Sequence, residues 1–161
     1  MLKESPTPEQ VAASFQKLET SAAKLNKVSD QLGESIAALD AALKRLNLGV
    51  PAWTKIAGAF DPNDSSYWSH DLGYAKVGGK WGVALRTVHG DAGDPESERV
   101  ERWLFNDAPR AMRLAAIDYI PALFDELVKA AEVIAEQTQD KIGSVQRVVS
   151  AVTAHATARR K

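Results

Sequence analysis

Apolar side chains recur in alternating steps of four and three residues near both ends of the chain, which is the spacing of helices that pack against other helices. In the first stretch, residues 7–47, Thr7-Pro8-Glu9-Gln10 indicates a capping box with a proline in the first helical turn. Gly49 and Pro51 mark the end of this helix. Its predicted seam is Val11, Phe15, Leu18, Leu25, Leu32, Ile36, Leu39, Leu43 and Leu46.

The same spacing returns in residues 120–158, where Lys141 interrupts the seam. A shorter helix, from Pro109 to Tyr119, is predicted before it. Each long helix should measure about 57 Å, because a helix rises 1.5 Å per residue. The seam of the second long helix consists of Phe124, Leu127, Ile134, Val145 and Val152.

The matched lengths predict an antiparallel, coiled-coil-like stalk that carries a compact head, residues 48–119. A single helix pair would leave part of each apolar stripe in water. A second chain would cover it as a four-helix bundle, so we expect a homodimer. The alternative is that the head or the short helix folds back over the stripe.

Within the head, apolar residues recur at every second position, and this pattern predicts a three-stranded antiparallel sheet. The strands are expected at His70–Val77, Lys80–Val88 and Glu98–Asn106, with a loop over residues 89–98. The Gly78-Gly79 turn fixes the register, so that Asp71 faces Arg86. Residues 51–60 are predicted to form a short amphipathic helix that covers one face of the sheet.

One face of the central strand pair carries almost no side chains, because Gly73, Ala75, Gly82 and Ala84 all lie on it. Glycine at such positions most often allows another part of the backbone or a helix to pack closely. A flat ligand or a partner strand is the alternative occupant. The sequence favours packing.

Composition supports one α+β domain over residues 1–161, with 45% hydrophobic and 25% charged residues. The net charge of −1 gives no sign of an arm that binds polyanions. The chain has no cysteine, which removes disulfides and thiolate chemistry. The sequence shows neither a signal peptide nor a membrane-spanning stretch, so we expect a cytoplasmic protein with no membrane partner.

Aromatic and basic side chains gather in the head, as they do in sheets that bind single-stranded nucleic acid. Acidic neighbours balance them, which argues against nucleic acid as the partner. Asp91, Asp94 and Glu96 do not have the spacing of a calcium loop. The candidate ligand or partner surface is Tyr74, Lys76, Trp81, Arg86, Arg102, Arg110 and Arg113.

The sequence contains no motif for phosphate cradling, nucleophilic catalysis or dinucleotide binding, so neither a catalytic residue nor a cofactor or metal is predicted. We therefore expect a non-enzymatic interaction and assembly module that dimerises through its helices and presents the head to a protein partner. A binder of nucleic acid or a small anion through the head is the alternative. An enzyme of unknown substrate is a second alternative.

Overall fold

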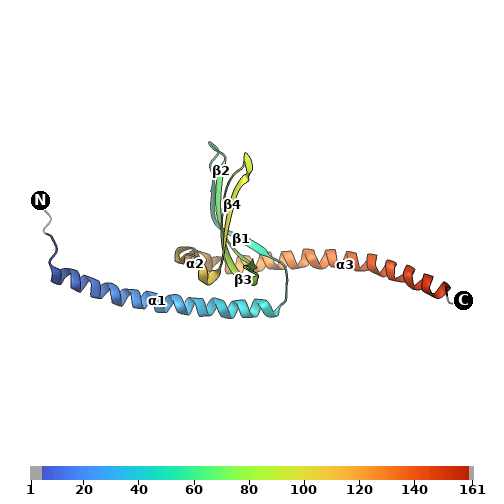
Figure 1. Cartoon of the computed structure of the whole chain (residues 1–161), viewed down its shortest axis with the longest axis horizontal. Coiled ribbons are helices and arrows are strands. Elements are labelled where there is room, and N and C mark those ends of the chain that lie inside the picture. The colour runs from blue at the N-terminus through green and yellow to red at the C-terminus, as the bar shows by residue number, and fades with distance from the viewer. Residues whose placement is uncertain (1–4, 160–161) are drawn as a thin grey trace. The chain divides into compact units, whose positions relative to one another are not determined.

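The computed structural model describes residues 5–159 (Figure 1). They form two compact units, one ending at Ala42 and the other beginning at Leu43. The elements are α1 (Pro8–Arg45), β1 (Ala52–Phe60), β2 (Ser66–Val77), β3 (Lys80–Asp91), β4 (Asp94–Leu104), α2 (Arg110–Ala116) and α3 (Ile120–Ala158). Short 3-10 turns, Phe105–Asp107 and Ile117–Tyr119, flank α2.

The predicted capping box begins α1. The backbone N–H of Thr7 donates to Gln10 Oε1 at 2.9 Å, and that of Gln10 donates to Thr7 Oγ1 at 3.3 Å. The helix ends at Arg45, and the left-handed backbone of Asn47 and Gly49 then turns the chain. Val11, Phe15, Leu18 and Leu25 are exposed on this helix, whereas Leu32, Ile36 and Leu39 are half-buried or buried.

The sheet has four antiparallel strands in the order β1-β2-β3-β4, so the prediction of three strands is wrong. The additional strand is β1, in the segment that was predicted to be a helix. A bulge between Lys55 and Ala57 shifts the pairing of β1 with β2. A bulge adds one residue and breaks the two-residue alternation, which explains why the sequence hides this strand.

The connection between β3 and β4 is also shorter than predicted. β3 continues to Asp91 and β4 starts at Asp94, so only Ala92 and Gly93 turn the chain. Pro95 is tolerated because β4 lies at the edge of the sheet, where a backbone donor can be missing. The predicted register between β2 and β3 is confirmed, from Val77 opposite Lys80 to Asp71 opposite Arg86.

One face of the sheet contributes to the core. Leu72, Val83 and Leu85 are completely buried on this face. α3 contacts β1 and β2, and α2 contacts β2. These two helices and the turn before α2 supply further large core side chains, namely Phe105, Met112, Leu123 and Leu127.

The opposite face holds the small residues, and they are buried too. Trp53, directly across from Gly73 on β1, lies over it. A Cβ atom at Gly73 would lie 2.5 Å from Trp53 Cδ2 and 2.7 Å from the carbonyl oxygen of Ala52. Close packing is therefore confirmed at Gly73, although the covering group comes from a neighbouring strand and not from a helix.

Only the beginning of α3 is packed. Leu123 and Leu127 are buried, whereas Ile134, Val145 and Val152 are 44%, 60% and 64% exposed. The helix continues well beyond the sheet (Figure 1). Within residues 5–159, none of the helices has the length and apolar character needed to cross a membrane.

We predict that Gly73→Ala lowers the free energy of unfolding by about 2 kcal/mol or more, because an added methyl group must displace both an indole ring and a backbone carbonyl. Urea unfolding followed by tryptophan fluorescence measures the change. Gly143→Ala in α3 is the matched control. A Cβ atom at Gly143 meets nothing within 4 Å, so this change should stabilise by about 0.5–1 kcal/mol. Equal stability of the Gly73 variant and the parent would contradict the packing.

Candidate functional site

A depression of about 370 Å³ lies on the Trp53 face of the sheet. All four strands contribute to it. Its walls are partly apolar, with Trp53, Val88 and Val100, and partly charged. The remaining lining residues are Thr54, Lys55, Ser69, Asp71, Glu98, Arg86 and Arg102.

The charged part is a row of directly opposed residues, one from each strand. Lys55 faces Asp71, Asp71 faces Arg86, and Arg86 faces Arg102. Directly opposed residues have their side chains on the same face of a sheet. Three cations and one carboxylate therefore lie side by side across the depression. We call these four residues the charged row.

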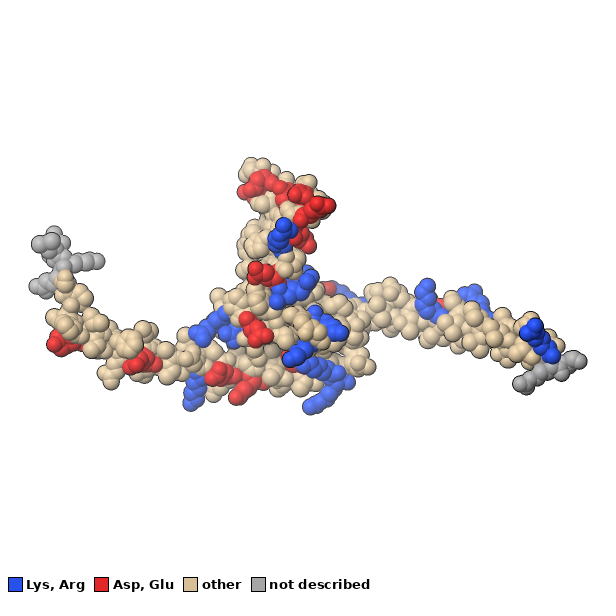
Figure 2. All heavy atoms as spheres, viewed as in Figure 1, with Lys and Arg blue, Asp and Glu red and all other residues tan. Residues whose placement is uncertain are grey.

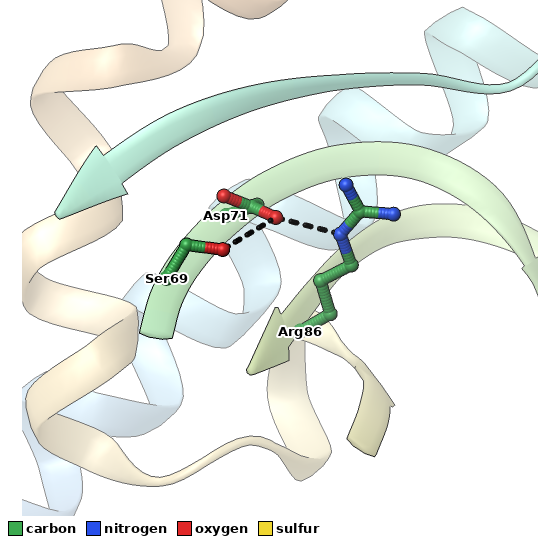
Figure 3. Close-up of polar contacts among 3 residues, drawn as sticks. All are labelled: Ser69, Asp71 and Arg86. Carbon is green, nitrogen blue, oxygen red and sulfur yellow. Dashed lines mark hydrogen bonds and ion pairs between the residues drawn. The ribbon is translucent and has the colours of Figure 1, made fainter. Parts of the chain in front are cut away.

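The centre of the charged row is held by short polar contacts (Figure 3). Arg86 Nε donates to Asp71 Oδ2 at 2.7 Å, and Ser69 Oγ donates to the same oxygen at 3.3 Å. Because Asp71 is only 5% exposed, its ion pair with Arg86 holds the guanidinium group in a fixed position. The guanidinium carbon of Arg86 also lies 4.2 Å from the centre of the Trp53 ring, a cation–π contact.

A second carboxylate, that of Glu98, lines the depression and has a different partner. The hydroxyl of Tyr67 donates to Glu98 Oε2 at 2.7 Å. This hydrogen bond stabilises the neutral phenol beside a negative charge, and therefore raises the pKa of Tyr67 above its ordinary value. Tyr67 also lies over Gly90, its cross-strand partner, as Trp53 lies over Gly73.

The depression contains only two of the predicted surface residues, Arg86 and Arg102. Tyr74 and Trp81 stack with ring centres 5.5 Å apart on the other face, where Lys76 is paired with Trp81. Arg110 and Arg113 do not line the depression; Arg110 is exposed, and the Nε atom of Arg113 is buried without a hydrogen-bond partner within residues 5–159. The predicted surface is therefore not one site.

The sequence interpretation missed Trp53, Lys55 and Ser69 as site residues. Asp71 and Arg86 were expected to face each other, but only as charges that compensate. Lys55 and Trp53 join the site because β1 is a strand. The aromatic Trp53 and the β-branched Thr54, residue types that favour strands, were the available signal.

Acidic side chains gather at the end of the sheet formed by the β1–β2 and β3–β4 connections (Figure 2). Several of these carboxylates accept backbone N–H groups within their own turns: Asp61 from Asn63, Asp64 from Ser66 and Asp91 from Gly93. In the described part of the chain, no group of three His, Asp or Glu side chains could hold a metal ion. These acids therefore stabilise turns.

A second candidate surface is the apolar stripe of α3. Ile134, Val145, Val148 and Val152 are separated from Leu127 by the same four- and three-residue steps, so they continue the face of the helix that packs in the core. Each of the four is between 44% and 64% exposed. We call these four residues the α3 stripe.

Comparisons of the chain with protein-family models, with curated proteins and with solved structures give no match. The charged row and the α3 stripe are therefore the features that indicate a function.

We predict that Asp71→Asn lowers the free energy of unfolding by about 2 kcal/mol, because it leaves the partly buried Arg86 without its counter-charge. Glu126→Gln is the matched control, since it removes the exposed Lys129–Glu126 pair, which should contribute less than about 0.5 kcal/mol. Urea unfolding of both variants measures the difference. Similar losses in the two variants would show that Asp71 does not hold the charged row.

Proposed function

We propose that the protein is a non-enzymatic assembly module in which α3 pairs with α3 of a second copy while the sheet remains available to a partner. The observation that carries this proposal is the α3 stripe. Soluble proteins rarely leave a long row of large apolar side chains in water without a binding role. From residue 134 to residue 152 the stripe extends over roughly 27 Å of helix.

Continuity with the core supports pairing with another helix. Leu127 buries the same helix face against the rest of its own unit, and Ile134 lies one heptad further along. An isolated helix of this kind gains most of its stability from packing of its apolar face. A helix of the same spacing would extend the packing that the sheet begins.

The order of residues along the stripe favours a second copy in antiparallel orientation. The seam positions 134, 138, 141, 145, 148 and 152 are symmetric about residue 143. In an antiparallel pair Ile134 lies opposite Val152 of the second copy, and Lys141 opposite Val145. In a parallel pair the two Lys141 side chains would face each other, and like charges in contact are destabilising.

We predict that the full chain is a dimer at 100 µM by light scattering on a size-exclusion column, with partial dissociation at lower concentration. Val148→Glu together with Val152→Glu should give a monomer, because in the antiparallel pair these charges would face Thr138 and Ile134 of the second copy and would be buried without a cation. Circular dichroism should show that the variant remains folded, with helix lost at most from the part of α3 beyond Leu127, which then lacks a packing partner.

The matched control is Ser150→Glu together with Ala154→Glu. It adds the same charge at exposed positions on the opposite side of α3 and should leave the dimer intact. A parent chain that is monomeric at 100 µM would contradict self-association. Equal dissociation of the two variants would show that charge, and not the stripe, controls assembly.

The direction of pairing has its own test, because the chain has no cysteine. In the antiparallel pair, Ile134→Cys alone should not form a disulfide-linked dimer, since the two thiols would lie about 27 Å apart. Ile134→Cys combined with Val152→Cys should cross-link efficiently under mild oxidation, as shown by non-reducing gels. Efficient cross-linking of the single variant would indicate parallel pairing.

A further inference from the structure

We propose that the charged row is a binding site for a small organic anion that carries a phosphate or carboxylate beside an apolar group. This inference concerns the sheet and does not depend on self-association. Every residue that lines the depression belongs to the unit that begins at Leu43.

Arg86 is positioned to bind an anion. Its Nε atom donates a hydrogen bond to Asp71, and the flat face of its guanidinium group lies over the Trp53 ring. Figure 3 shows both terminal nitrogens directed away from Asp71. Neither of them makes a hydrogen bond within residues 5–159. Two adjacent N–H donors on one guanidinium form the fork that binds phosphate and carboxylate groups in a bidentate manner.

The two outer cations of the charged row are also without an acidic partner. Ion pairs shorter than 4.0 Å join Arg86 to Asp71 and Lys129 to Glu126, and within residues 5–159 neither Lys55 nor Arg102 takes part in one. The row carries three positive charges and one negative charge. Glu98, which also lines the depression, accepts a hydrogen bond from the Tyr67 hydroxyl. Its negative charge reduces the excess of positive charge without cancelling it.

The apolar walls decide what kind of anion fits. Val88 and Val100 lie in the row of the sheet next to Arg86 and Arg102, opposite each other, and Trp53 lies on the other side. A volume of about 370 Å³ is at the small end of ligand sites and admits a molecule of the size of one substituted ring. An anionic group at Arg86 would place a ring or alkyl group against these side chains.

Competing surfaces do not meet these conditions. The groove between Leu43, Leu46 and the beginning of α3 is mostly apolar, and the one charged residue in its lining is an acid, Glu132, which does not attract an anion. The acidic end of the sheet repels anions. The charged row combines free donors, excess positive charge and apolar walls in one depression.

Phenyl phosphate is a suitable probe because it has one anionic group and one ring. Isothermal titration of the full chain should show saturable binding below about 1 mM, with inorganic phosphate and benzyl alcohol each at least about tenfold weaker. Weaker binding of both fragments is expected, since each keeps only one of the two kinds of contact. Absence of saturable binding up to 10 mM probe would overturn the proposal.

Substitution of the outer cations tests the location without disturbing the buried pair. Lys55→Gln together with Arg102→Gln changes two exposed residues and should weaken phenyl phosphate binding by about tenfold or more. Lys76→Gln together with Arg110→Gln removes the same charge elsewhere and should change the affinity less than about twofold. Equal weakening by both pairs would mean that net charge, and not the row, attracts the anion.

A short oligothymidylate distinguishes a small-molecule site from a nucleic-acid surface. It should bind no more tightly than phenyl phosphate at 150 mM salt, because the row offers contacts for one anionic group. Binding of the oligonucleotide about a hundredfold tighter, with a steep loss as salt rises, would overturn the proposal in favour of a nucleic-acid surface.

Discussion

The indole of Trp53 occupies the space that a side chain at Gly73 would need, and much of the molecule depends on this contact. Because Gly73 has no Cβ atom, the ring lies flat against β2 and covers the centre of the sheet. The exposed side of the ring then supports the guanidinium of Arg86. Arg86 in turn provides the counter-charge that allows Asp71 to be buried. The absence of a side chain at Gly73 thus allows Trp53 to pack against β2 and to support the charged row through Arg86.

The long helices were predictable because their signals are local. Thr7 and Gln10 are three residues apart and cap α1 as the sequence predicts, and α3 begins and ends at the predicted residues 120 and 158. The register of β2 with β3 was predictable for the same reason. Two adjacent glycines with positive φ, Gly78 and Gly79, close a two-residue turn, which leaves only one pairing for the strands.

The fourth strand was not predictable from alternation alone. The bulge after Lys55 inserts one residue, so the later residues of β1 face the opposite side of the sheet from the side that strict alternation would give. The extension of the β3–β4 hairpin was hidden for a different reason. Most of its residues beyond His89 are exposed and polar, so burial does not impose a pattern on them. The charged row could not be recognised without β1. Three separate predictions about strands must be correct before Lys55, Asp71, Arg86 and Arg102 are seen as neighbours.

Trp53 lines the anion depression and a groove that reaches the first residue of the α3 stripe. Val133 and Ile134, at the beginning of the exposed part of α3, line this groove with it. A change at Trp53 would therefore alter anion affinity and helix association for separate physical reasons. Lys55 and Arg102 touch only the depression, and Val145 and Val152 lie more than two helical turns beyond the groove. Trp53 is shared by the linings of the anion depression and this groove. If anion binding changes self-association in the parent chain, linkage requires that association change anion affinity by the same factor.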